Sequence, residues 1–280
     1  MNKRILIPTD FSKNALNATR YALDLYAKQN CDFYFLNVFH LDSYTTNTLI
    51  MPEPGSAEYD STKAASEESF TKLLEMLELH NDNPKHTYHT TATLNYLSVA
   101  IEELIAKKDI DLVVMGTKGA TGAKGVIFGS NTVKTMEKIT QCPVLAVPEN
   151  VRFSPLKEVV FPTDFKLSYK KRKEMDYLID IVRMHNAAIR VLHISKNETL
   201  SKTQEENKQL LEDIFSNVEC TFHTLKNIDV AQGVTTFVAS RNSDMIAFIN
   251  KKHFFFGSVF SKPLVKEIGY DATTPILALH

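Results

Sequence analysis

The feature that most constrains the fold of this chain is an internal repeat. The tetrapeptide Pro-Thr-Asp-Phe occurs at Pro8–Phe11 and again at Pro162–Phe165, each time directly after a short apolar run. Both halves of the chain also end alike, with a Pro-aliphatic-Leu-Ala-aliphatic run at 143–147 and at 275–279. Landmarks that recur in one order indicate two structural units of common ancestry.

The length of the chain agrees with two units, because 280 residues are enough for two ordinary domains with their own apolar cores. We expect these domains at about 1–149 and 156–280, with the linker Asn150–Pro155 between them. The first copy is the longer one, and its extra segment Leu41–Ser61 contains two prolines, a glycine and many small polar residues. Such a composition predicts a long surface loop.

Strand-like and helix-like segments alternate in each half. Apolar runs such as Leu112–Met115 have the continuous hydrophobicity of a central parallel strand, whereas 94–108 places Leu97, Ile101 and Leu104 at helical spacing. Further helical segments are expected at 12–30, 132–140 and 166–186. The alternation predicts right-handed crossovers and, in each domain, a doubly wound α/β fold with a mostly parallel sheet of five strands.

The charge balance gives no sign of a nucleic-acid or membrane partner. The chain has 32 basic and 33 acidic residues, so it produces no strong overall field. Its densest basic run, Lys170–Lys173, has no interleaved aromatic residues for stacking on bases. The apolar run before Pro8 is too short for a signal peptide, and no apolar stretch approaches the roughly 20 residues needed to span a bilayer. We therefore expect a cytoplasmic protein.

The cysteines and histidines do not form a metal-site pattern. Cys31, Cys142 and Cys220 are odd in number and each lies in or beside an apolar run, so we expect reduced, buried thiols. His86 and His89 are three residues apart and would face opposite sides of a strand.

The turn after the fourth strand of the first half concentrates the glycines. Five of the nine glycines in the chain lie within 116–129. A backbone without Cβ atoms can present its N–H groups closely to a ligand, and the helix expected next would attract anions to its N-terminus. Lys118 and Lys124 could add positive charge beside phosphates. Because neither of the two common nucleotide-binding signatures is present, the residues alone leave open a glycine-rich loop or lid without a ligand.

A family resemblance narrows this choice. The spacing Gly116-x2-Gly119-x9-Gly129-Ser130 resembles the pattern typical of ATP-binding members of the universal stress protein family, and it lies where that family has it, between the fourth strand and the fourth helix. The segments 7–12 and 142–147 are also similar to the family's. The resemblance covers both halves and implies an adenine nucleotide alpha hydrolase-like fold with strand order 3-2-1-4-5 in each domain. It further implies that the two fifth strands meet as a pseudo-dimer within the chain.

The resemblance also implies which residues of the first domain contact ATP. Pro8, Thr9 and Asp10 would line the adenosine side, and Val38 would meet adenine through its backbone. The ribose and phosphates would be surrounded by Met115, Gly116, Thr117, Lys118, Gly119, Gly129, Ser130, Asn131 and Thr132, the hydroxyls donating directly or through a magnesium ion. Considered alone, Asp10 is equally well explained as a helix N-cap.

The second half departs from this pattern. Ile249 and Lys252 stand where the first copy has Gly116 and Gly119, and the stretch 250–260 is bulky and aromatic. We therefore expect no ATP in the second half. Its four phenylalanines are predicted to fill the vacated pocket or to form a contact surface.

These observations together predict a stress-associated regulatory protein that binds one ATP per chain and acts on an unidentified protein partner. A nucleotide-free interaction module with a relic glycine loop is one alternative. A slow ATPase, in which Lys118 or Thr121 positions a water, is another, although the sequence contains no nucleophile signature of the common hydrolases. The sequence also leaves open whether two chains form a homodimer in addition to the pseudo-dimer within each chain.

Overall fold

The computed structural model describes residues 2–39, 54–80, 82–117, 129–167, 169, 173–195, 199–250 and 274–280. The elements of the first half are β1 (Lys3–Pro8), α1 (Lys13–Leu25), β2 (Cys31–Val38), α2 (Ala57–His80), β3 (His86–Thr93), α3 (Leu97–Lys108), β4 (Leu112–Gly116), α4 (Ser130–Lys138) and β5 (Val144–Val147). Those of the second half are β6 (Glu158–Pro162), α5 (Lys173–His185), β7 (Ala188–Ser195), α6 (Lys202–Ile214), β8 (Cys220–Lys226), α7 (Val230–Arg241), β9 (Met245–Ile249) and β10 (Ile276–Leu279).

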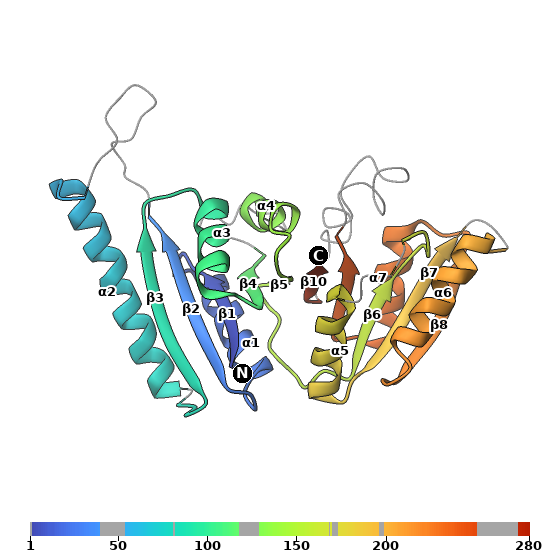
Figure 1. Ribbon diagram of the computed structural model, residues 1–280. Helices are drawn as coiled ribbons and strands as arrows, with labels where there is room; N and C mark the ends of the chain where they lie inside the picture. Colours follow the sequence, from blue (N-terminus) through green and yellow to red (C-terminus); the bar gives the residue numbers. More distant parts are fainter. Residues whose placement is uncertain are drawn as a thin grey trace, which may run out of the picture.

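All ten of these strands join one continuous sheet, in the order β3-β2-β1-β4-β5-β10-β9-β6-β7-β8 (Figure 1). Within each half the strands are parallel and follow the order 3-2-1-4-5, which confirms the expected doubly wound α/β fold. The halves meet where β5 and β10 pair antiparallel, with Leu145 opposite Leu277. The expected pseudo-dimer is therefore present, and each half covers a strand edge of the other.

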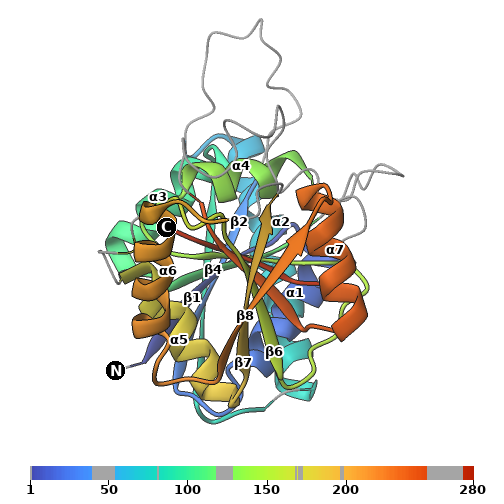
Figure 2. The same ribbon diagram turned by 90° about the vertical axis from the view of Figure 1, so that its right-hand side faces the viewer.

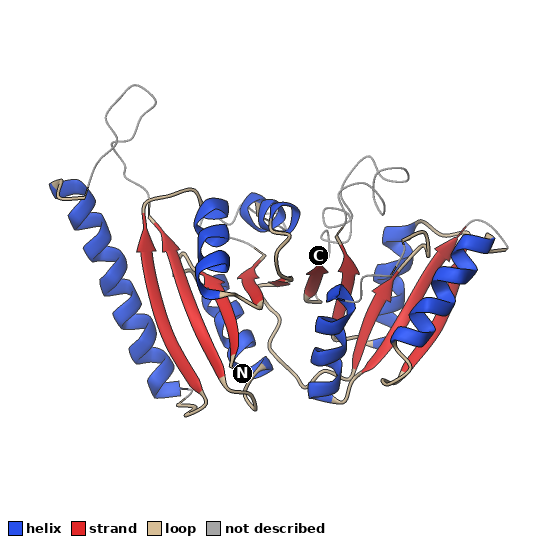
Figure 3. Cartoon of the chain, viewed as in Figure 1, coloured by secondary structure: helices blue, strands red, loops and turns tan. Residues whose placement is uncertain are grey.

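Helices cover both faces of this sheet, as the secondary-structure view shows (Figure 3). One apolar layer lies between the sheet and α1, α2, α5 and α6, and contains Phe33, Phe161 and Phe215. The other lies beneath α3, α4 and α7. Seen from the second half, α5 and α6 lie on one side of the twisted sheet and α7 on the other (Figure 2). Among the described residues, no helix is both long and apolar enough to cross a membrane.

Several helix boundaries differ from the sequence-based expectation. The segment Leu41–Ser61 was expected to be a loop throughout, but α2 already begins at Ala57, because Ser56 accepts a hydrogen bond from the Tyr59 amide (3.4 Å) and acidic residues occupy the first turn. Residues 41–53 lie outside the described part. The helices α1 and α5 are shorter than the expected spans 12–30 and 166–186, whereas α4 begins two residues earlier, at Ser130.

The cysteines are all free. Cys31 and Cys142 are buried, as expected, whereas Cys220 is only half-buried. Burial raises the pKa of the first two thiols to about 12 and that of Cys220 to about 11, so the neutral thiol form is favoured at each position.

Candidate functional site

The turn after β1 is fixed by its own polar side chains. The Thr9 amide donates to the carbonyl of Leu36 in β2 (2.8 Å), and the Thr9 hydroxyl accepts a hydrogen bond from the Phe11 amide (3.0 Å). Phe11 adopts a left-handed backbone conformation with φ 60°, which reverses the chain after the strand. The Asp10 carboxylate accepts from the Ser12 amide (3.0 Å), and Ser12 in turn caps α1. Asp10 thereby becomes exposed at the carboxyl edge of the sheet.

Two further side chains, which the sequence reasoning missed, hold this turn in place by hydrogen bonds. The side-chain amide of Asn37 donates to the Thr9 carbonyl (2.7 Å), and the hydroxyl of Ser66 in α2 donates to the Asn37 side-chain oxygen (2.8 Å). All three residues are buried. A polar residue within the otherwise apolar run 33–38 was the available signal for Asn37.

Val38 lies where β2 runs past the end of β1. The last β1 residue, Pro8, pairs with Leu36, so β2 extends two residues further. Backbone groups of a strand alternate in direction, and the Leu36 carbonyl points toward β1 whereas the Phe39 amide bonds to Thr93 on the other side. The N–H and C=O of Val38 therefore point toward the space beyond β1, where they can donate to and accept from a ligand.

Gly116, the last residue of β4, allows α1 to approach the strand closely. A Cβ at this position would lie 2.7 Å from the side-chain nitrogen of Asn14, which is itself buried. No larger residue fits without moving α1 or the Asn14 side chain. Gly116 ends β4, and the Thr9 turn follows β1. These two strands are neighbours at the point where the strand order reverses, which is where α/β proteins bind ligands.

The two ends of the glycine-rich loop are held together. The Gly129 amide donates to the Thr117 carbonyl (2.6 Å), and the Thr132 hydroxyl donates to the Gly116 carbonyl (2.8 Å). Gly129 is the N-cap residue of α4, and among the described residues no side chain caps this helix. Ser130 and Asn131 are exposed in its first turn. Lys118 and Gly119, also expected at the site, lie outside the described residues.

The second half repeats the turn but fills the space beside it. The Thr163 amide donates to the Leu192 carbonyl (2.9 Å) and Phe165 has φ 57°, as in the first half. However, the Tyr169 hydroxyl lies 2.6 Å from the Thr163 hydroxyl and Tyr169 is 3% exposed. Ile249, also buried, ends β9 as Gly116 ends β4. The phenylalanines of 250–260 that were expected to fill a pocket lie outside the described residues.

The described residues define a tandem α/β protein, in which the N-terminus of α4 lies at the carboxyl ends of the strands of the first half. A model of the universal stress protein family matches residues 1–148. The chain belongs to this family, as its motifs suggested.

Known relatives cover one or both halves. The universal stress protein MJ0531 of Methanocaldococcus jannaschii is 31% identical over 147 residues, which are 52% of this chain and 81% of that protein. A universal stress protein from Archaeoglobus fulgidus covers 98% of this chain with 97% of its own, at a TM-score of 0.69 and 15% identity. A shorter universal stress protein from the same organism, solved in complex with dAMP, covers 45% of this chain with 100% of its own, at 16% identity and a TM-score of 0.34.

Proposed function

We propose that this protein is a regulatory ATP-binding protein that holds one nucleotide in its first half. The observation that carries the proposal is the closed base of the glycine-rich loop. Gly116 and the N-terminus of α4, which no described side chain caps, are bonded into one unit beside the turn at Pro8–Asp10. A helix N-terminus that offers free amides at a strand switch point is a suitable site for phosphates.

The burial of the candidate residues divides them into two groups. Asp10, Ser130 and Asn131 are exposed and can contact the nucleotide with their side chains. The remaining described candidates would act through their backbone or by positioning their neighbours, and they are Pro8, Thr9, Val38, Met115, Gly116, Thr117, Gly129 and Thr132. Thr132 in particular already donates its hydroxyl to Gly116, so we assign it a positioning role.

The orientation of the nucleotide follows from this division. Adenine would lie beyond the end of β1, where the Val38 N–H and C=O can bond to its edge, and the phosphates would lie at the first turn of α4. Magnesium bound with ATP is usually held mostly by phosphate oxygens and few protein ligands, and the Ser130 hydroxyl is an exposed oxygen suited to join it. Lys118 and Gly119 complete the proposed contacts. Occupancy would then order the loop and change the surface offered to a protein partner.

Calorimetric titration with magnesium ATP tests the proposal. We expect one site per chain, and no binding in Gly116→Val or Gly129→Val, because the first inserts a side chain against Asn14 and the second places one at the phosphate-facing N-cap. Tyr169→Phe, a change in the equivalent region of the second half, is the matched control and should bind normally. Two sites per chain, or normal binding in both glycine variants, would refute the proposal.

Mass spectrometry of gently purified protein provides an independent measurement. A retained adenine nucleotide excludes the relic-loop alternative. Steady phosphate release from ATP that is lost in Lys118→Ala would instead indicate that the protein is a slow ATPase.

A further inference from the structure

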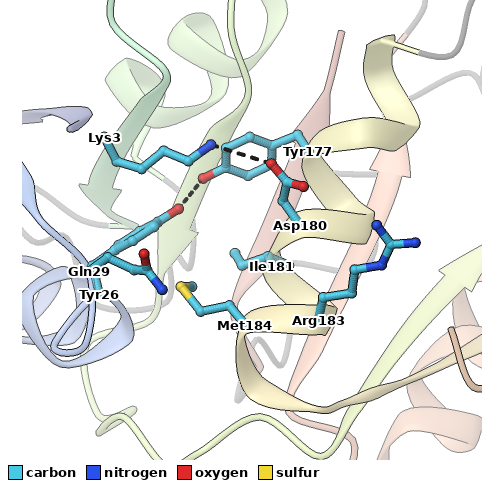
Figure 4. A pocket seen from close by; sticks show the side chains of 8 residues that line it. All are labelled: Lys3, Tyr26, Gln29, Tyr177, Asp180, Ile181, Arg183 and Met184. Atoms are coloured by element: carbon cyan, nitrogen blue, oxygen red, sulfur yellow. Dashed lines mark hydrogen bonds and ion pairs between the residues drawn. The ribbon is translucent and has the colours of Figure 1, made fainter. Parts of the chain in front are cut away.

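A cleft of about 380 Å³ opens between the two halves (Figure 4). It lies at the amino-terminal end of β1, whereas the proposed nucleotide site lies at the carboxyl-terminal end of that strand. Lys3, at the start of β1, and Tyr26, just after α1, line it from the first half. Tyr177, Ile181 and Met184 line it from α5 of the second half. The volume falls within the roughly 300–1,000 Å³ typical of small-molecule sites.

The walls of this cleft are mainly apolar, apart from the Gln29 side chain, and the two tyrosine hydroxyls between them are paired. The hydroxyls of Tyr26 and Tyr177 hydrogen-bond to each other across the boundary between the halves (Figure 4). Of the apolar lining residues, Tyr177 and Met184 are half-buried and present their surface to the cleft, whereas Tyr26 and Ile181 lie buried behind them. The nearby His185 ring of the second half also hydrogen-bonds to the Leu25 carbonyl of the first half (3.0 Å). These hydrogen bonds hold the two walls in place before any ligand binds.

The mouth of the cleft is polar and includes two cationic side chains, Lys3 and Arg183. The Lys3 ammonium pairs with the Asp180 carboxylate at 3.4 Å, longer than the roughly 2.7–2.9 Å of a strong charge-assisted hydrogen bond. The ammonium therefore keeps donor capacity for a ligand. Arg183, also part of the lining, forms no ion pair with any described residue. Lys3 and Arg183 are thus the two cations of the lining and Asp180 is its carboxylate, while Asp111 adds a negative charge near the tyrosine hydroxyls. An anionic group would therefore bind at the Lys3 ammonium.

We propose that this cleft binds a small amphipathic organic anion, with an apolar body against Tyr177 and Met184 and a carboxylate at Lys3. Lys3 and Pro8 are the two ends of β1, so the cleft and the nucleotide site are roughly 16 Å apart along the strand. The two ligands would not compete for space. Because both halves line the cleft, its ligand would also stabilise their contact.

Calorimetry and methyl NMR of the full-length protein with 4-phenylbutyrate test the proposal. We expect one saturable site per chain and a shift of the Met184 methyl signal. Lys3→Gln should weaken binding by about tenfold or more, the loss expected when a charged hydrogen-bond partner is removed. Met184→Trp should abolish binding, because the larger side chain fills the cleft. The exposed Lys107→Gln at the end of α3 is the control and should bind normally.

Two matched probes separate charge from apolar contact. The neutral 4-phenylbutanamide should bind more weakly than the carboxylate, and its affinity should not change in Lys3→Gln. No saturable binding of 4-phenylbutyrate, or binding that survives Met184→Trp in a folded variant, would overturn the proposal. Preferential binding of the cation 4-phenylbutylamine would also overturn it, because the ligand class would then be wrong. None of these outcomes depends on ATP binding.

Discussion

At the scale of single residues, two hydrogen bonds join the described residues on either side of the glycine-rich loop. The Thr132 hydroxyl satisfies the carbonyl of Gly116, and the Gly129 amide satisfies that of Thr117. Thr132 and Thr117 are 2% and 1% exposed, so water cannot easily replace these bonds. A buried carbonyl that loses its donor retains its full desolvation penalty.

Thr132→Val tests this bond with little change of shape. We expect the free energy of unfolding to fall by about 1–3 kcal/mol, because the Gly116 carbonyl would be left buried and unpaired. Urea denaturation measures the change. Thr71→Val is the control, since its hydroxyl also bonds to a backbone carbonyl in a helix but is exposed, and it should alter stability by less than about 0.5 kcal/mol. Equal stability of Thr132→Val and the parent protein would contradict this account.

At the scale of elements, one carboxylate joins three segments of the second half. Glu158 begins β6 and accepts hydrogen bonds from Arg190 in β7 (2.8 Å), from Arg241 at the end of α7 (2.7 Å) and from Ser243 (2.7 Å). Burial opposes the charge of Glu158, but the hydrogen bonds from Arg241, Arg190 and Ser243 outweigh it and lower the pKa from 4.5 to about 2. The first half has Arg4 in the equivalent strand, bonded to the Lys108 carbonyl and Asp109.

This network predicts an acid-dependent loss of stability. The folded pKa of Glu158 lies below its ordinary value, so its contribution is complete above about pH 4.5 and declines as the pH falls toward 2. The total decline should be roughly 3 kcal/mol. Denaturation at a series of pH values should show a smaller decline in Glu158→Gln, which is already less stable at neutral pH. The exposed Glu68→Gln should behave as the parent protein, and an identical pH profile for Glu158→Gln would show that the network is not responsible.

At the scale of the whole molecule, the antiparallel pair β5–β10 makes one sheet from two halves. Leu145 and Leu277 face each other there and are fully buried. Further contacts join the two halves, including an ion pair between Lys3 and Asp180, the hydrogen bond between the Tyr26 and Tyr177 hydroxyls, and a hydrogen bond between the His185 ring and the Leu25 carbonyl. We propose domain limits of 1–149 and 156–280 on this basis.

A fragment of residues 1–149 tests these limits. Its β5 edge would be open, so we expect the fragment to fold and to self-associate through β5, because an unpaired strand edge readily pairs with another chain. Sedimentation analysis would detect the dimer. Ala146→Pro in the fragment is the control: Ala146 pairs with β10 in the full chain, and the substitution removes an amide from the free edge. A folded fragment that stays monomeric would show that β5 alone does not suffice for association.

The sequence alone determined the fold class and the duplication, and it predicted where the candidate site lies, because each depends on patterns that can be read along the chain. Apolar runs, helical spacing and clustered glycines are readable within about 20 residues, and the recurrence of Pro-Thr-Asp-Phe needs no structure to be seen. The continuous sheet with order 3-2-1-4-5 in each half confirmed what these patterns and the family resemblance indicated.

Only the tertiary structure decided which side chains meet across long separations. Asn37 and Ser66 support the Thr9 turn from different elements, Tyr169 fills the space in the second half, and Tyr26 meets Tyr177 from a distance of 151 residues in sequence. No local pattern encodes such pairs, because the residues become neighbours only when the sheet and its helices pack. The cleft between the halves exists for the same reason.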